Sequence, residues 1–176
     1  RRYGSDAKWQ GSSTMKKELM PNHTLIFRKL FPYKSHKKPS SHIATLGIGG
    51  NIGDTIRRFD RLFWYLQKDR DIEVLQTSPI LKNPPFGYTN QDDFYNAIMV
   101  ISTTKTPKEL LEYILRVEKK FSRKRPFKDA PRTLDIDMIF YDDIILNTKK
   151  LTLPHPQYSS RVSVLIPLSY IKRYKR

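Results

Sequence analysis

The segment from Ala130 to Phe140 constrains the fold most, because it places two carboxylates two residues apart within an apolar, strand-like run. Side chains of an extended strand alternate between faces and the rise is about 3.3 Å per residue, so Asp135 and Asp137 share a face with Cα atoms roughly 6.6 Å apart. The alternation sends the apolar side chains to the opposite face, into a core: Leu134, Ile136, Met138 and Phe140. The segment therefore predicts a strand that is covered on one face only.

Two carboxylates at this separation indicate a metal site. They can bind a pair of Mg²⁺ ions about 3.5 to 4 Å apart, the geometry that holds a phosphate during in-line displacement, and Arg132 adds positive charge just upstream. The alternative is that Asp135 and Asp137 lie on the solvated face of a half-exposed strand. Asp is a poor strand former, however, and two of them beside an Arg and after a Pro form a local conflict typical of functional sites.

The composition limits the class of protein. A chain of 176 residues and 20.8 kDa suits one domain with a tail. It has no Cys, which excludes a disulfide framework, a thiolate zinc site and a catalytic thiol. No apolar run approaches the roughly 18 residues that span a bilayer, and no secretory signal is recognisable. We therefore expect a soluble protein in a reducing cytoplasm.

The net charge of +16 is unevenly distributed. Residues 1–41 contain ten Lys or Arg and two acidic residues, so less than a quarter of the chain carries half of the charge. This stretch shows no sustained hydrophobic period and predicts a flexible or loosely packed basic arm, with the native start at Met15 or Met20. Residues 42–176 are predicted to form the catalytic domain.

The order of the elements predicts an α+β fold. Residues 42–48 form a short apolar strand, and Asp54 is a candidate N-cap for a helix. Two further strands are expected over residues 72–80 and 95–103. The helix after Asp54 has apolar residues at helical spacing: Ile56, Phe59, Phe63 and Leu66.

A second helix is predicted after Thr106, which forms a capping box with Glu109 and has Pro at the first helical position. Its apolar face is formed by four residues: Leu110, Ile114, Val117 and Phe121. With the Asp-containing strand last, the order is βαββαβ, which indicates a ferredoxin-like sheet with both helices on one face and long loops at the site.

Four stretches of the chain resemble the 6-hydroxymethyl-7,8-dihydropterin pyrophosphokinase family, and the resemblance covers residues 43–169. They are Gly49–Asn51, Asn83–Gly87 with Phe94–Asn96, Pro131–Asp137, and Leu151–His155 followed by Arg161 and Pro167–Leu168. The resemblance implies an ATP-dependent diphosphotransferase of folate biosynthesis, which transfers pyrophosphate from ATP to the pterin alcohol and releases AMP. It implies two Mg²⁺ ions, ATP and the pterin as small-molecule substrates, no nucleic-acid or membrane partner, and a monomer.

The resemblance also implies roles for particular residues. Asp135 and Asp137 would bind the metals, and Arg123 and Arg132 would join them as catalytic residues. Arg123 and Arg125 would lie on a loop over the triphosphate if a one-residue gap is allowed; without the gap Lys124 takes the place of Arg125. The ATP-binding positions are Arg125, Arg132, Met138, Lys150, Thr152, His155 and Arg161. The pterin-binding positions are Asn83, Pro84, Pro85, Phe86, Phe94 and Asn96. Glu118 matches a family position on the second helix, although a surface ion pair would also explain it.

The sequence departs from the family pattern at three places. Asp129 stands where members often carry Trp, so the loop would close differently. Ser163 replaces an aromatic residue that would form the second side of the pterin sandwich. Gly49-Gly50-Asn51 replaces Gly-Ser-Asn, which we expect to be tolerated because Gly fits any turn geometry.

Other interpretations remain open from the sequence. The basic Arg123–Lys128 segment can be an ordinary surface loop, Phe94 can be a core residue and His155 a structural one. A single-stranded RNA-binding module would also combine a ferredoxin-like sheet with basic loops, but it gives no reason for two aspartates on a central strand. A catalytically idle homologue is the third possibility.

Overall fold

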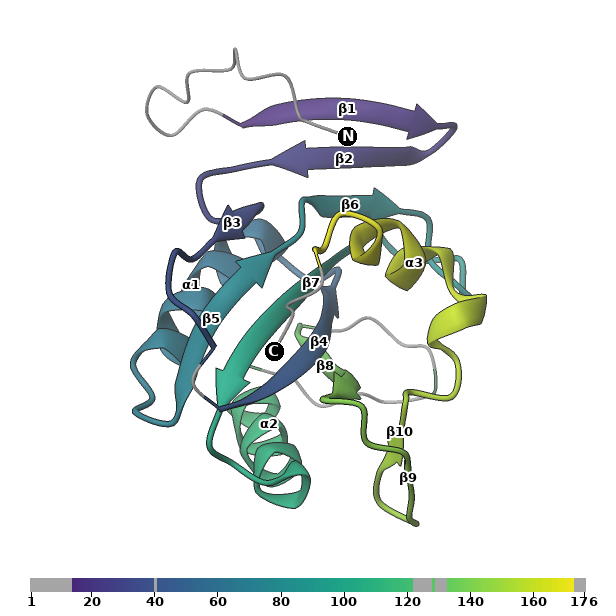
Figure 1. Cartoon of the computed structure of the whole chain (residues 1–176). Helices are drawn as coiled ribbons and strands as arrows, with labels where there is room; N and C mark the ends of the chain where they lie inside the picture. The colour runs from purple at the N-terminus through teal and green to yellow at the C-terminus, as the bar shows by residue number, and fades with distance from the viewer. Residues whose placement is uncertain (1–13, 40, 122–127, 129–132, 173–176) are drawn as a thin grey trace.

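The computed structural model describes residues 14–39, 41–121, 128 and 133–172. Its main sheet is antiparallel and has the order β1-β2-β6-β7-β4-β8, with β5 also paired to β7 and β3 paired to β5 (Figure 1). The strands of this sheet are β1 (Met15–Met20), β2 (His23–Phe27), β3 (Tyr33–Lys34), β4 (His42–Gly50), β5 (Ile72–Thr77), β6 (Ile80–Asn83), β7 (Phe94–Thr103) and β8 (Asp135–Tyr141). The remaining elements are α1 (Thr55–Gln67), α2 (Pro107–Phe121), the hairpin of β9 (Leu146–Asn147) and β10 (Thr152–Leu153), the 3₁₀ turn η1 (Tyr158–Ser160) and α3 (Val162–Leu168). The predicted α+β class is confirmed.

The predicted strand over residues 72–80 is divided into β5 and β6. Pro79 cannot donate to a strand ladder, and Ser78 replaces part of the interrupted pairing. The Ser78 backbone N–H donates to the Ile98 carbonyl at 2.9 Å, and its Oγ accepts from the Ile98 N–H at 2.8 Å. The break lets both β5 and β6 pair with β7, which is ten residues long.

Both predicted helix starts are confirmed. The Asp54 carboxylate accepts from the Arg57 N–H at 3.1 Å and caps α1. At α2, the Thr106 N–H donates to Glu109 Oε1 at 3.0 Å, while the Glu109 N–H donates to Thr106 Oγ1 at 3.2 Å. These two bonds satisfy amide groups that a helix start otherwise leaves without partners.

The sheet is covered on both faces. α1 and α2 bury their apolar stripes on one face, together with inward residues of β4, β5, β7 and β8. On the other face, α3 packs over Leu75, Ile98 and Val100 (Figure 1). The helices are therefore not confined to one face, although the two predicted helices are. Within the described residues, no helix is both long enough and apolar enough to cross a membrane.

The N-terminal segment differs from the flexible arm expected over residues 1–41. β1 and β2 form a hairpin that joins the sheet through β6, and Leu25, Ile26 and Phe31 are buried. Phe31 packs against Phe59 of α1 with ring centroids 6.0 Å apart. The flexible-arm prediction is thus wrong for residues 14–39; residues 1–13 and 40 lie outside the described part of the chain.

A β-bulge changes the predicted alternation at the end of β8. Leu46 of β4 pairs with Met138 and Thr45 pairs with Phe140, so Ile139 is the extra residue. Beyond a bulge the side chains change faces. Phe140 therefore leaves the core predicted for it and packs against Tyr158 at 4.9 Å between ring centroids, while Tyr141 takes the core position.

Candidate active site

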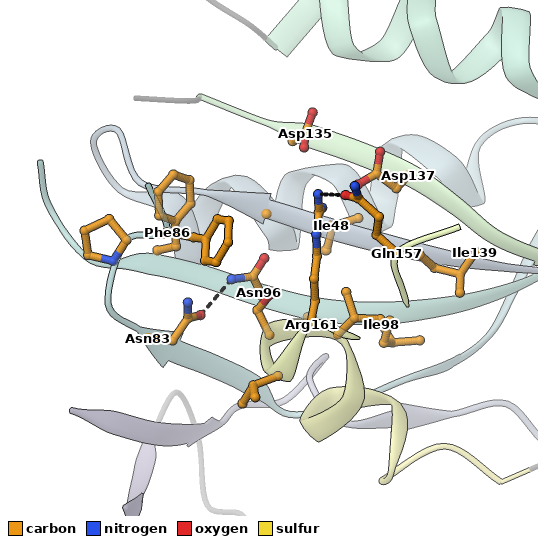
Figure 2. Close-up of a pocket in the computed structure, with 18 of the residues that line it drawn as sticks. Ile48, Asn83, Phe86, Asn96, Ile98, Asp135, Asp137, Ile139, Gln157 and Arg161 are labelled. Carbon is orange, nitrogen blue, oxygen red and sulfur yellow. Dashed lines mark hydrogen bonds between the residues drawn. The ribbon is translucent and has the colours of Figure 1, made fainter. Parts of the chain in front are cut away.

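A pocket of about 490 Å³ lies on the face of the sheet opposite α1 and α2. Its floor is formed by β4, β7 and β8, and its sides are formed by the loop after β6 and by the segment that leads into α3 (Figure 2). This volume is in the range of small-molecule sites. The pocket has an acidic end on β8 and an amide-lined end near β6.

The acidic end is formed by Asp135 and Asp137, which are half-buried and share the pocket face of β8. They pair across the ladder with Gly49 and Gly47 of β4. Since glycine has no side chain, the floor between β8 and β7 stays open. A methyl group on Gly49 would lie 2.7 Å from Oδ1 of Asn96, so only glycine leaves that side chain in place.

The backbone between the two carboxylates is held from α2. Glu118 Oε1 accepts from the Ile136 N–H at 3.1 Å, and among the described residues β8 is the last strand on its side of the sheet. An edge strand has backbone groups that no neighbouring strand pairs. Glu118 satisfies one of them and thereby fixes the strand at the point where its carboxylates project.

The other end of the pocket is lined by two amides and by apolar rings. Asn96 Nδ2 donates to Asn83 Oδ1 at 2.7 Å, and Asn83 Nδ2 donates to the Pro84 carbonyl at 3.0 Å. Phe94 is half-buried, and Phe86 is 83% exposed. All six residues predicted for the pterin side line this pocket: Asn83, Pro84, Pro85, Phe86, Phe94 and Asn96.

Asn51 holds the loop that carries part of this lining. Its Nδ2 donates to the Asp92 carbonyl and to Gln91 Oε1, both at 2.9 Å. The residue follows Gly50 at the end of β4. The Gly-Gly-Asn motif therefore places an amide that connects the central strand to the segment before β7.

Arg161 extends from the start of α3 across the pocket. Figure 2 shows its side chain directed toward Gln157 and the Asp137 end, and its guanidinium donates to Gln157 Oε1. Both residues line the pocket, as does Ser163 at the position of the missing aromatic. The arginine brings positive charge close to the half of the pocket that holds the carboxylates.

His155 is fixed next to the bulge of β8. Its backbone N–H donates to the Ile139 carbonyl at 2.9 Å, and its Nδ1 faces the Gln157 N–H at 3.2 Å. Because a backbone N–H can only donate, Nδ1 accepts, and the neutral ring carries its proton on Nε2. Nε2 is then a donor, which suits a phosphate oxygen.

The other predicted nucleotide residues are not brought into the pocket. Thr152 lies in β10 and Lys150 is exposed just before it, and neither lines the pocket, nor does His155. Met138 is buried in the core, so only its backbone could meet a nucleotide. Arg123, Arg125 and Arg132 lie outside the described residues. Asp129 and Ala130, in the loop whose sequence departs from the family pattern, also lie outside them.

Sequence reasoning did not single out several residues that line the pocket, among them His23, Ile139 and Gln157. Ile139 shares the pocket face of β8 with Asp135 and Asp137 through the strand alternation, and Gln157 is two residues beyond His155. His23 lies in the segment that was expected to be a flexible arm. The apolar run Leu25–Phe27 could have predicted a strand directly after His23.

The family model described as 7,8-dihydro-6-hydroxymethylpterin-pyrophosphokinase matches residues 45–173. The chain belongs to this family. A 2-amino-4-hydroxy-6-hydroxymethyldihydropteridine pyrophosphokinase of Campylobacter jejuni is 41% identical over 144 residues, covering 81% of this chain and 92% of that protein. The Helicobacter pylori protein of the same name is 39% identical over 148 residues, covering 82% and 91%. That of Aquifex aeolicus is 36% identical over 127 residues, covering 72% and 78%.

The match to the pterin pyrophosphokinase family includes every residue that lines the pocket except His23. The four stretches that suggested the family from the sequence also lie within it. The hairpin of β1 and β2 lies before the matched range. The hairpin is therefore a structural element outside the matched range, on the side of the pocket where the amides lie.

Proposed function

We propose that this pocket is the site at which the enzyme transfers a pyrophosphoryl group from ATP to 6-hydroxymethyl-7,8-dihydropterin, giving the pterin diphosphate and AMP in folate biosynthesis. The observation that carries the proposal is that one pocket joins a carboxylate pair to an amide-lined, aromatic end. The first suits the metals of a polyphosphate, and the second suits a flat heterocycle with several donors and acceptors.

The acidic end fits magnesium. Asp135 and Asp137 are hard oxygen donors, and among the described residues no group of three or more His, Cys, Asp or Glu side chains forms a site. Mg²⁺ is usually held by one or two carboxylates, with water and substrate phosphates completing its octahedron. We propose that two ions bind here with ATP. Bound Mg²⁺ would neutralise charge on the phosphates and make the β-phosphorus easier to attack.

The phosphate side is assigned to cationic and donor groups around the acidic end. Arg161 is directed across the pocket and His155 presents an Nε2 donor. We propose that they hold phosphate oxygens with Arg123, Arg125, Arg132, Lys150 and Thr152. Phosphoryl-type transfer depends on positioning and on stabilising charge, and it needs little covalent chemistry from the protein.

The pterin is assigned to the amide end. Asn83 and Asn96 would hydrogen-bond its edge, Phe94 would pack on its face, and the exposed Phe86 ring would cover it. The hydroxymethyl oxygen would then attack the β-phosphorus in line. The new O–P bond forms as the bond to the bridging α–β oxygen breaks, AMP leaves, and the alcohol proton passes to water. A monomeric state and a cytoplasmic location stay predictions from the sequence.

The rival proposal, a single-stranded RNA-binding module, has less support. Such modules bind RNA on the sheet face that their helices leave open. Here α3 packs on that face over Leu75, Ile98 and Val100, and its remaining part holds Asp135 and Asp137. Carboxylates would repel RNA phosphates. An RNA-binding module should bind RNA as well or better without them, whereas a pyrophosphokinase should lose turnover.

The test is AMP release from ATP and Mg²⁺ with and without the pterin, in the wild-type protein and in Asp137→Asn. We expect pterin-dependent AMP release that falls roughly 100-fold or more in the variant, because the charge that holds the metal is lost. Asp143→Ala is the matched control, since Asp143 follows the same strand but is exposed and does not line the pocket. Absence of AMP from the wild-type protein, or full activity in Asp137→Asn, would overturn the proposal.

A further inference from the structure

The hairpin of β1 and β2 reaches the pocket through His23, the first residue of β2. This residue lies outside the range that the family model matches, residues 45–173. Along β2, Leu25 and Phe27 belong to the cluster under α3, whereas Ile26 belongs to the core under α1 and α2. Because strand side chains alternate, His23 lies on the α3 face, the face that holds the pocket.

The pairing register places His23 at the amide end. Thr24 pairs with Lys82, so the ladder position next to His23 is that of Asn83, which itself pairs with Phe94. The strand order from β2 to β8 is β2-β6-β7-β4-β8. Neighbouring strands are about 4.8 Å apart, so β2 and β8 are separated by about 19 Å across the sheet. His23 is therefore next to the pterin side and far from the carboxylates.

The turn before β2 fixes the proton on the His23 ring. Nδ1 lies 2.9 Å from the Pro21 carbonyl oxygen. A carbonyl only accepts, so Nδ1 carries the proton, and in the neutral ring Nε2 is left as an acceptor. A pterin has amine and ring N–H groups on its edge. Asn83 cannot offer its oxygen as freely, because its Oδ1 already accepts from Asn96.

We propose that His23 is a specificity-determining residue of the pterin end, whose Nε2 accepts a hydrogen bond from an N–H group of the heterocycle. The inference rests on the proposed function of the pocket. It assigns part of substrate recognition to a hairpin that lies before the range matched by the family model. Ser163 at the start of α3 gives no aromatic ring to hold the pterin, so an added polar contact would contribute to its orientation.

The experiment measures binding of 6-hydroxymethyl-7,8-dihydropterin by calorimetry in the presence of Mg²⁺ and a non-hydrolysable ATP analogue, and binding of that analogue alone. His23→Asn keeps a donor for the Pro21 carbonyl but leaves no acceptor at the Nε2 position, while His23→Gln restores an oxygen near that position. We expect five- to tenfold weaker pterin binding in His23→Asn and His23→Ala, the loss of about one hydrogen bond. His23→Gln should recover part of the lost pterin affinity. In all three variants the affinity for the ATP analogue should change less than twofold.

His36→Ala is the matched control, since His36 lies in the same N-terminal segment, is exposed and does not line the pocket. Unchanged pterin affinity in His23→Asn would overturn the inference, and so would an equal loss of pterin and analogue binding with a lowered melting temperature, which would indicate a structural role. AMP release by the wild-type protein distinguishes failure of this inference from failure of the proposed function. If it occurs and His23→Asn equals wild type, only this inference fails; if it does not occur, the proposed function fails as well.

Discussion

Gly49 is the residue at which the two ends of the pocket come closest, because it lies between Asp135 of β8 and Asn96 of β7. A methyl group there would lie 2.7 Å from Asn96 Oδ1, a separation that forces the amide to move. We expect Gly49→Ala to break the Asn96–Asn83 hydrogen bond and to weaken pterin binding by roughly fivefold or more, as the loss of about one hydrogen bond. Calorimetry with the pterin measures the effect.

Gly47→Ala provides the comparison on the same strand. Its added methyl would meet Ile139 Cδ1 at 3.3 Å, the end of a flexible side chain that can move by a few tenths of an ångström. We therefore expect a smaller loss of pterin affinity than in Gly49→Ala. The opposite order would contradict the view that the amide pair, and not the shape of the floor alone, selects the heterocycle.

At this scale the sequence predicted residues whose positions depend on local geometry. Asp135 and Asp137 share a face because the strand period is two. Asn83 and Asn96 were expected only from the family resemblance, because their meeting depends on the pairing of β6 with β7. Phe140 was wrongly predicted to be a core residue, since a bulge depends on the pairing between β4 and β8 and not on the composition of β8.

Among the elements, α2 begins at the most complete cap, formed by Thr106 and Glu109. Thr106→Ala removes the Oγ1 acceptor of the Glu109 N–H, and the loss of an N-cap typically costs about 1 kcal/mol. We expect the free energy of unfolding to fall by about this amount at pH 7. Urea denaturation followed by far-UV circular dichroism measures it, and Lys108→Ala, an exposed neighbour in the same turn, should change it far less.

The cap also predicts a pH dependence. The Thr106 backbone N–H, followed by its hydroxyl, holds the pKa of Glu109 below its ordinary 4.5. A lowered carboxyl pKa contributes stability that is present above pH 4.5 and is lost as the pH falls through the folded-state value. Glu109→Gln should therefore be less stable than wild type at pH 7, and the difference should shrink below pH 4.5. A difference that grows in acid would contradict this account.

Element types were more predictable than their ends. Caps and hydrophobic periods are local, so α1 and α2 were predicted with their starts. The division of residues 72–80 depends on Ser78, whose Oγ replaces a ladder group opposite Ile98. The Ser78 hydroxyl can do this only when β7 lies beside it, so no local sequence pattern predicts where the strand divides.

In the whole molecule, the N-terminal segment is part of the sheet and of the core. Its basic composition predicted a flexible arm, yet a few apolar residues decide its position: Leu25, Ile26, Phe27 and Phe31. Each gains burial only against partners far along the chain, such as β6 and α1. Composition averages over charged neighbours and cannot register such contacts, which is why the hairpin and its His23 were missed.

Phe31 allows this integration to be tested. Its ring is fully buried, with centroids 6.0 Å from Phe59 and 6.5 Å from Phe63, both on α1. Phe31→Ala should lower the free energy of unfolding by about 3 to 5 kcal/mol, the cost of removing a buried aromatic ring. Because the ring bridges the segment and the helix layer, the protein should still unfold in one transition.

Urea denaturation followed both by circular dichroism and by tryptophan fluorescence measures this stability and its cooperativity together. Lys29→Ala is the control in the same segment, because its side chain is exposed and surface substitutions usually change stability by less than about 0.5 kcal/mol. A flexible arm would give the two variants the same stability. A large loss of unfolding free energy in Phe31→Ala alone, with the same transition by both probes, would instead show that the hairpin unfolds together with the rest of the enzyme. His23, which the hairpin contributes to the pocket, would then belong to the same cooperative unit.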